Sequence, residues 1–313
     1  MKQIRVGIVG FGNLGKAVLE FFSNNPKIKV VAVFSKHLNK SFIFGVPVFR
    51  PEQSLRFKNK IDIMVLCTGS QNDMLKDAPL FAQHFNIINS FDTHKRIKQQ
   101  LNIINDICKE NKTFAIISCG WDPGVFSIFK AYFSLFCEHF AVFYGKGISL
   151  GHTNAVKKIN GVKDAISFTL PNRNKLKEAK MGCVLPANLL NRNVFVVANK
   201  NRQIIKSKIL NIKNYFKGEN TKISFVSQEK LNSLKTLAHK GEIFAFSNIA
   251  SNEMYNLKFK TSSNPMATAK ILLAFSLNML KLKEKYGAGA FTPLDFSPKD
   301  LLLNKNSIFK GII

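Results

Sequence analysis

A strand-like run that leads directly into a glycine turn most strongly limits how this 313-residue chain can fold. The run IRVGIV is β-branched and nearly free of charge, which is typical of a strand buried on both faces of a parallel sheet. Gly10, Gly12 and Gly15 follow as GFGNLG, residues 14–22 then have helical spacing, and residues 30–34 are again strand-like. A bare glycine turn would merely join a strand to a helix. The complete order predicts a dinucleotide-binding Rossmann unit.

The residues at the turn and at the second strand's end suggest the cofactor. In such a unit the first glycine permits the turn, the second lets the backbone approach a pyrophosphate, and helix amides face the phosphates. The second strand ends in a hydroxyl and cations, where an NAD site usually has an acidic residue for the ribose. A 2′-phosphate suits this loop, so we expect NADP, although an ordinary surface of a lysine-rich protein would also hold the lysine. The expected cofactor contacts are Gly10, Gly12, Asn13, Leu14, Gly15, Ser35, Lys36, His37, Thr68, Gly69 and Ser70.

The alternation of strands and helices continues along the first 120 residues. Strands are predicted at residues 61–68, 86–90 and 114–118, and helices at residues 79–85 and 97–110. This order predicts an α/β fold with a doubly wound parallel sheet. Because ligands of such sheets bind beyond the carboxyl ends of the strands, the residues that follow each strand become the candidates for a site.

Two aspartates follow predicted strands in a chain where acidic residues are scarce. Each has an ordinary explanation, since Asp92 could cap a helix beginning near His94, and Asp122 before Pro123 suits a tight turn. The single tryptophan, Trp121, stands beside the second aspartate. Together the three would form a pocket wall beside a nicotinamide, with two carboxylates for a substrate ammonium.

Composition excludes several other classes of protein. The chain has 46 Lys+Arg against 19 Asp+Glu, a formal charge of +27, but its lysines are scattered and no nucleic-acid motif accompanies them. A compositional drift toward lysine therefore explains the charge better than nucleic-acid binding. Five cysteines without a CxxC pair indicate reduced thiols, a cytoplasmic protein and no metal site. No apolar stretch is long enough to cross a membrane, and no secretion signal is expected.

Five motifs together resemble one enzyme family over almost the whole chain. They are GFGNLGK near the start, FDTHK from residue 91, SCGWDPGVFS from 118, GKGISLGHTNAV from 145 and GAGAFTPL from 287. The chain thereby resembles the meso-diaminopimelate dehydrogenases. This resemblance implies NADP-dependent, reversible oxidative deamination of meso-2,6-diaminopimelate at its D-centre. The products are L-2-amino-6-oxopimelate, which cyclises to tetrahydrodipicolinate, and ammonia, in the biosynthesis of lysine and peptidoglycan precursors. It also implies a homodimer.

The resemblance assigns site residues where the motifs match. Asp92 and Asp122 would hold the amino group at the reacting centre, with Trp121 packed against that end of the substrate. Backbone amides around Leu150 and Gly151 would receive a carboxylate. The distal L-centre would be bound by Thr169, Arg192, His239 and Asn264, with Tyr144 where relatives often have a tryptophan.

Departures from the family pattern occur at both ends of the expected site. Relatives often have two arginines where this chain has Lys36-His37, and commonly PHGG where it has Ala238-His239-Lys240-Gly241. Taken without the resemblance, Thr169 is routine in a strand, Arg192 could be a surface cation, and Asn264 before proline could cap a helix.

The remaining expectations concern domains and rival functions. Residues 1–120 should form the Rossmann domain and residues 121–264 a mixed α+β substrate and dimerisation domain. That second domain has strands at 193–199 and 221–227. Residues 265–313 should pack partly on the first domain, with 266–285 as a long amphipathic segment. Rival readings are an oxidoreductase of similar build, such as a dihydrodipicolinate reductase or a homoserine or sugar dehydrogenase, and a non-catalytic NADP-binding sensor.

Overall fold

The chain folds into two compact units, Met1–Phe129 with Pro265–Ile313 and Lys130–Asn264. The structure, a computed structural model, describes residues 3–70, 72–183, 189–199, 201–213, 215–247 and 253–302. Residues 303–313 of the expected C-terminal segment lie outside the described residues. Trp121 and Asp122 belong to the first unit by this division.

The first unit contains an eight-stranded sheet in the order β15-β7-β6-β5-β1-β2-β4-β3. All neighbours pair in parallel except β3 and β4. The order reverses around β1, which has β2 on one side and β5 on the other, as a dinucleotide-binding sheet requires. The strands are β1 Ile4–Val9, β2 Ile28–Phe34, β3 Phe42–Ile43, β4 Val46–Phe49, β5 Ile63–Leu66, β6 Asn86–Asn89, β7 Phe114–Ile116 and β15 Gly289–Phe291.

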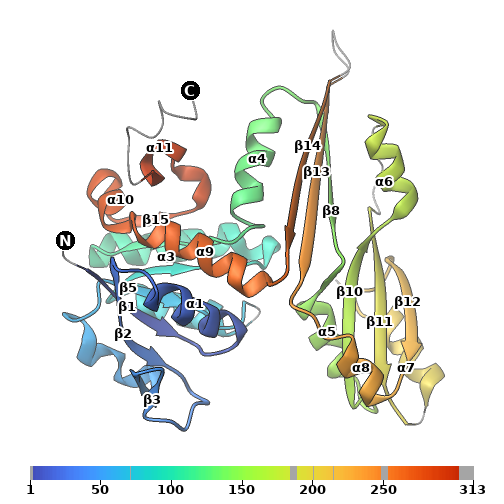
Figure 1. Ribbon diagram of the computed structural model, residues 1–313, viewed down its shortest axis with the longest axis horizontal. Coiled ribbons are helices and arrows are strands. Elements are labelled where there is room, and N and C mark those ends of the chain that lie inside the picture. Colours follow the sequence, from blue (N-terminus) through green and yellow to red (C-terminus); the bar gives the residue numbers. More distant parts are fainter. Residues whose placement is uncertain are drawn as a thin grey trace. The chain divides into compact units, whose positions relative to one another are not determined.

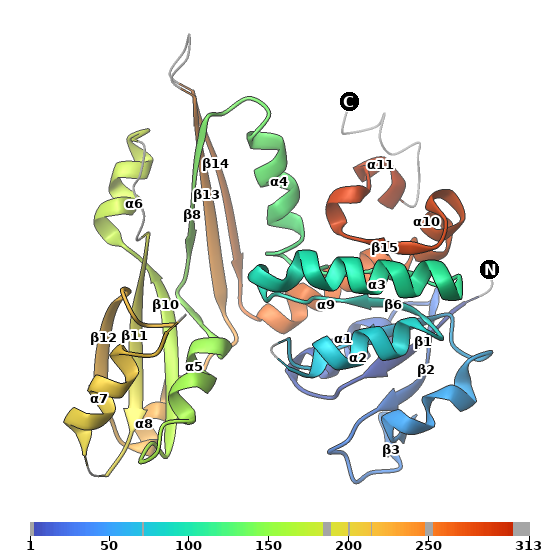
Figure 2. The same cartoon turned by 180° about the vertical axis from the view of Figure 1, so that it is seen from behind.

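Helices cover both faces of this sheet, which confirms the predicted doubly wound α/β fold. Apolar residues of α1 (Asn13–Ser23), α9 (Asn264–Ser276) and α10 (Met279–Tyr286) share one core with the strands. Those of α2 (Asp73–Ala82) and α3 (Ile97–Asn111) share the other. Figure 1 shows α1 and α9 in front of the sheet, and Figure 2, from behind, shows α2 and α3. Burial on both faces explains why the strands lack the polar alternation of a half-exposed sheet.

Two predicted helices differ from those found. The helix expected at residues 79–85 begins six residues earlier, at Asp73, with Pro79 inside it. An interior proline removes one backbone hydrogen bond but is tolerated when the apolar face of the helix is buried, as it is here. The segment expected at 266–285 is two helices. The side chain of the buried Asn278 donates to the carbonyls of Ala274 and Leu301 at the break, at 3.1 and 2.9 Å.

The second unit contains two smaller sheets. One has the order β12-β11-β10-β9, and the other is the antiparallel β14-β13-β8. Residues of α5 and α7 share a core with the four-stranded sheet, α8 packs in a second cluster with β10 and β11, and α6 packs on the three-stranded sheet. The bounds are β8 His139–Tyr144, β9 Gly147–Ile148, α5 Leu150–Lys157, β10 Asp164–Pro171, α6 Arg173–Lys180, β11 Leu190–Val197, α7 Arg202–Leu210, β12 Asn220–Phe225, α8 Gln228–Ser233, β13 His239–Ser247 and β14 Glu253–Thr261. The remaining elements are α4 Val125–Phe133, α11 Pro298–Leu301 and the 3-10 helices Pro51–Phe57, His94–Arg96 and Pro293–Asp295.

Among the described helices, none combines the length and the apolar character needed to cross a bilayer.

Candidate functional site

The glycine turn after β1 has the geometry that its three glycines require. Gly10 has a φ of +87°, a conformation that side chains disfavour. A Cβ on Gly15 would lie 2.1 Å from the carbonyl oxygen of Gly10, so only glycine lets α1 approach the turn this closely. A Cβ on Gly12 would meet no atom within 4 Å. The space in front of Gly12 is therefore open.

This turn fits the phosphates of a dinucleotide. Gly12 is the N-cap of α1 and makes no side-chain cap, and the first amides of any helix have no intrahelical acceptor. Those amides, which include Asn13 and Leu14, are a suitable anion site next to the open space at Gly12. Thr68 lies against the same turn, because a Cβ on Gly10 would come within 2.9 Å of its methyl carbon. The residues present are thus compatible with a pyrophosphate at this position.

The loop after β2 carries the expected hydroxyl and cations, and an arginine that follows β4, which no sequence motif indicated, contacts this loop. Ser35 is 6% exposed, whereas Lys36 and His37 are exposed. The backbone amide of Ser35 donates to the carbonyl of Phe49 at 3.0 Å, because β4 pairs with β2 in parallel. Arg50, the next residue, donates from its guanidinium to the carbonyl of Lys36. A further cation therefore stands where an adenosine phosphate would be recognised.

The two aspartates follow neighbouring strands of the sheet. The amide of Cys119 donates to the carbonyl of Asn89 at 2.8 Å, which places the chain that precedes Asp122 beside the chain that precedes Asp92. Asp92 is exposed and Asp122 is partly buried. The explanation of Asp92 as a helix cap is wrong, because Thr93 and Arg96 occupy the N-cap positions that follow it.

Trp121 is 7% exposed, and its ring packs edge-on against Phe126 at 5.1 Å between centroids. The turn that contains Asp122 is closed by hydrogen bonds from Gly120 to the carbonyl of Pro123 and from Val125 to the carbonyl of Gly120, both 3.0 Å. Asp122 is thus a turn residue, as its ordinary explanation requires, and is also adjacent to the buried indole.

Strand register in the second unit brings several of the expected distal residues together. In the sheet, Thr169 is paired with Gly147 on one side and with Arg192 on the other. Thr169 is 6% and Arg192 9% exposed, so the explanation of Arg192 as a surface cation is wrong. A Cβ on Gly147 would lie 2.4 Å from the ring of His239, so this ring packs directly on Gly147, the strand partner of Thr169.

The other predicted residues of this unit are connected to Gly147, Thr169, Arg192 and His239 either by short distance along the chain or by backbone hydrogen bonds. Tyr144 pairs with Gly241 two residues after His239, and the amide of Asn264 donates to the carbonyl of Leu237 at 2.7 Å. Leu150 and Gly151 open α5, directly after β9. Leu150 is 71% exposed. Burial lowers the pKa of His239, whose Nδ1 is 3.1 Å from its neighbour's carbonyl, so the neutral ring is favoured.

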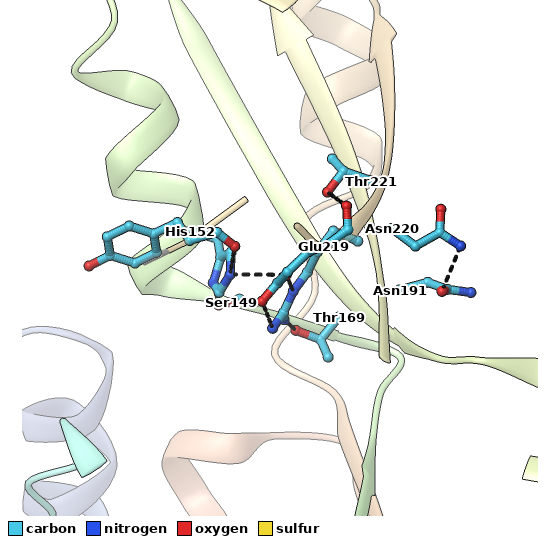
Figure 3. A network of polar contacts seen from close by, with 9 residues as sticks. Ser149, His152, Thr169, Asn191, Glu219, Asn220 and Thr221 are labelled. Carbon is cyan, nitrogen blue, oxygen red and sulfur yellow. Dashed lines mark hydrogen bonds and ion pairs between the residues drawn. The ribbon is translucent and has the colours of Figure 1, made fainter. Parts of the chain in front are cut away.

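Glu219, which no sequence motif indicated, binds Arg192. Figure 3 shows Glu219 close to His152 and Thr169. Arg192 donates from Nε to one carboxylate oxygen at 2.6 Å and from Nη2 to the other at 3.4 Å, and its Nη1 donates to Thr169 Oγ1. His152 Nε2 lies 3.6 Å from the same carboxylate. The hydrogen bonds and charges of His152 and Arg192 outweigh burial and lower the pKa of Glu219 to about 2. Glu219 is therefore ionised at every physiological pH.

No sequence signal pointed to Glu219, because it precedes a short strand and belongs to no motif. Its role depends on the parallel pairing of β11 with β12, which sets Arg192 opposite Thr221. Within the described part of the chain, no group of three or more His, Cys, Asp or Glu side chains is placed to hold a metal ion.

Comparisons with known proteins agree with this arrangement. The family model described as the diaminopimelic acid dehydrogenase C-terminal domain matches residues 120–264. A model of an oxidoreductase family with an NAD-binding Rossmann fold matches residues 4–96.

Among curated relatives, the meso-diaminopimelate D-dehydrogenase of Ureibacillus thermosphaericus is 33% identical, covering 96% of this chain and 98% of its own. A solved structure of C. glutamicum diaminopimelate dehydrogenase in complex with diaminopimelate is 29% identical, with a TM-score of 0.92 and 100% of both chains covered. An engineered D-amino acid dehydrogenase bound to NADP+ is 28% identical, with a TM-score of 0.89 and 100% of both chains covered. The chain therefore belongs to the meso-diaminopimelate D-dehydrogenase family.

Proposed function

We propose that this protein is an NADP-dependent meso-diaminopimelate dehydrogenase of lysine and peptidoglycan precursor biosynthesis. The observation that carries the proposal is the near full-length match to enzymes of this name, in a chain whose glycine turn fits a dinucleotide. One solved relative holds diaminopimelate and another holds NADP+. The reaction converts the D-centre of the substrate to a ketone, with release of ammonia. When bound, NADP+ supplies the hydride acceptor.

At the reacting centre, Asp92 and Asp122 hold the substrate's amino group, and Trp121 packs against that end. The ammonium must lose one proton before the carbon can give up a hydride. One of the two carboxylates accepts this proton, directly or through a water molecule between them, which as general base catalysis contributes about 10²–10⁴ in rate. Water then adds to the iminium carbon of the substrate, and the resulting carbinolamine collapses to ketone and ammonia. The reacting end thus needs no side chain that forms a covalent bond.

At the distal L-centre, Arg192 and Thr169 bind the carboxylate, with His239 and Asn264 as further polar partners. The backbone amides at Leu150 and Gly151 donate hydrogen bonds to a carboxylate of the substrate. Tyr144, which precedes them in the chain, is a further substrate contact. Both ends of the substrate carry identical groups, so the handedness of the site alone selects the D-centre. Distal contacts therefore help to align the reacting atoms to about 3–3.5 Å.

Arg192→Ala is expected to raise the Michaelis constant for meso-diaminopimelate about 10–100-fold, and that for NADP+ by less than about twofold. The reason is the loss of charged hydrogen bonds, each worth about 1.5–3 kcal/mol, to the distal carboxylate. Steady-state kinetics with each substrate varied in turn measure both constants. Equal changes in the two constants would show that the distal assignment is wrong.

NADP is the proposed cofactor because Ser35, Lys36 and His37 follow β2 without an acidic residue, and Arg50 adds a cation next to them. Arg50→Ala should weaken NADP+ binding about tenfold, equivalent to ~1.4 kcal/mol, with little change for NAD+, because only NADP+ has the 2′-phosphate. Isothermal titration calorimetry with both cofactors gives the two affinities. Arg56→Ala, which changes an exposed cation in the 3-10 helix that follows Arg50, is the control. Similar losses for both cofactors would contradict a phosphate contact.

The function is tested by the absorbance change at the NADPH band with meso-diaminopimelate, compared with its LL and DD isomers. Activity on the meso isomer with NADP+ is the expected result. Turnover of none of the isomers would leave the rival oxidoreductases and the non-catalytic sensor. A gel shift with random DNA at physiological salt distinguishes the enzyme from a sensor that contacts nucleic acid through its positive charge. We expect no shift for the enzyme.

A homodimer in the cytoplasm completes the proposal. Exposed apolar side chains gather in the second unit around β8, β14 and the end of α4, where the rings of Phe136 and Tyr255 lie 5.2 Å apart. Phe136 is 46%, Phe140 48% and Met254 47% exposed. A second copy of the chain is the partner that we propose for this surface. Light scattering should give about twice the 35.2 kDa of one chain.

A further inference from the structure

The charge of Arg192 is compensated inside the second unit before any ligand binds. Glu219 accepts hydrogen bonds from Nε and Nη2, at 2.6 and 3.4 Å, and the Thr169 hydroxyl accepts one from Nη1. These contacts use three of the five guanidinium N–H groups, which leaves one on each terminal nitrogen for a ligand carboxylate. The side chain of Arg192 is 11% exposed and that of Glu219 36%.

His152 lies against Glu219 and is held in place by two further hydrogen bonds. His152 Nε2 lies 2.9 Å from the carbonyl of Tyr215, and because a carbonyl only accepts, this nitrogen carries a proton. Nδ1 lies 2.8 Å from the hydroxyl of Ser149, which can donate to it. Both ring nitrogens of His152 are thus hydrogen-bonded. Figure 3 shows this set from close by, with Thr169 on the other side of Glu219.

The Arg192–Glu219 pair therefore carries no net charge and places a positive and a negative group side by side. Glu219 Oε1 has only the long contact to Nη2 among the described hydrogen bonds, so it retains capacity to accept from a ligand ammonium. A lone guanidinium would favour a ligand end with a net negative charge. A guanidinium paired with a carboxylate favours an end that carries both an ammonium and a carboxylate, since each ligand charge then meets its opposite.

Resting on the proposed function, we infer that Glu219 determines specificity at the distal end of the substrate. It selects an amino-acid end, with ammonium and carboxylate, over an end with a carboxylate alone. In this role Glu219 both orients Arg192 and accepts a hydrogen bond from the distal ammonium. The mutual arrangement of Glu219, Arg192 and Thr169 carries this inference.

The test compares meso-diaminopimelate with D-2-aminopimelate, which has the same chain and reacting end but no distal amino group. For the wild type, kcat/KM should be much higher with meso-diaminopimelate. In Glu219→Gln the ratio of the two kcat/KM values should fall by at least about tenfold, because the loss of the carboxylate leaves the site with a net positive charge. Glu219→Asp, which keeps the charge, should retain more than half of the wild-type preference on a logarithmic scale. Asp164→Asn, which removes an ion pair with Lys157 in the same unit, is the control and should leave the ratio unchanged.

A purely structural role of Glu219 would lower both kcat/KM values equally and leave their ratio unchanged, which would overturn the inference. A wild type that uses both substrates equally well would overturn it without any variant, even if Glu219→Gln does not fold. An equal loss of selectivity in the Asp and Gln variants would also overturn it, because charge would then not be the cause. No turnover of meso-diaminopimelate by the wild type would instead remove the proposed function, and this inference with it.

Discussion

Asp122→Asn is expected to lower kcat for meso-diaminopimelate by about 10²–10⁴, the contribution of a general base, while NADP+ binding stays unchanged. The amide is nearly isosteric with the carboxylate but accepts no proton at neutral pH. The substitution also removes a negative charge next to the substrate ammonium. Stopped-flow absorbance at the NADPH band measures the rate, and calorimetry measures the affinity for NADP+.

Two further variants make this result specific. Asp106→Asn changes an exposed aspartate on α3 of the same unit and should retain normal turnover. Asp92→Asn should also lower kcat, and the comparison with Asp122→Asn shows which carboxylate accepts the proton. Near-normal activity of Asp122→Asn would remove this residue from the mechanism.

Gly12→Ala is expected to weaken NADP+ binding about 10–100-fold without loss of stability. The backbone of Gly12, with φ −79°, is accessible to alanine, and the added Cβ would meet no protein atom within 4 Å. The methyl group would instead occupy the space where we expect the pyrophosphate. Overpacking of this kind costs about 1–3 kcal/mol, a range that includes the roughly 1.4–2.8 kcal/mol of a 10–100-fold change in Kd. Calorimetry gives the Kd and thermal melting gives the stability.

Gly15→Ala is the matched comparison, because its effect should appear without any cofactor. Its Cβ would lie 2.1 Å from the carbonyl oxygen of Gly10, so the turn and α1 must separate. The melting temperature should therefore fall for Gly15→Ala and stay nearly constant for Gly12→Ala. If Gly12→Ala bound NADP+ as tightly as the wild type, the phosphates would not bind at this turn.

The first unit could be predicted in detail because its signals are local. The strand Ile4–Val9 has the predicted bounds, and the doubly wound sheet follows from uninterrupted apolar runs that alternate with helical spacing. Two helices differ from the prediction. The helix expected at residues 79–85 begins at Asp73, and no local signal showed that the segment 266–285 breaks after Ser276, with Asn278 as the N-cap of the second helix.

By itself, the sequence determined the Rossmann unit, the glycine turn and, through the motifs, the enzyme family. Each of these depends on residues close together in the chain. Only the tertiary structure decided that Arg192 is buried and paired with Glu219, 27 residues later, and that Arg50, just after β4, contacts Lys36, just after β2. Strand pairing creates these contacts. Its register depends on burial across whole sheets, so no local pattern in the chain reveals which polar side chains will face each other.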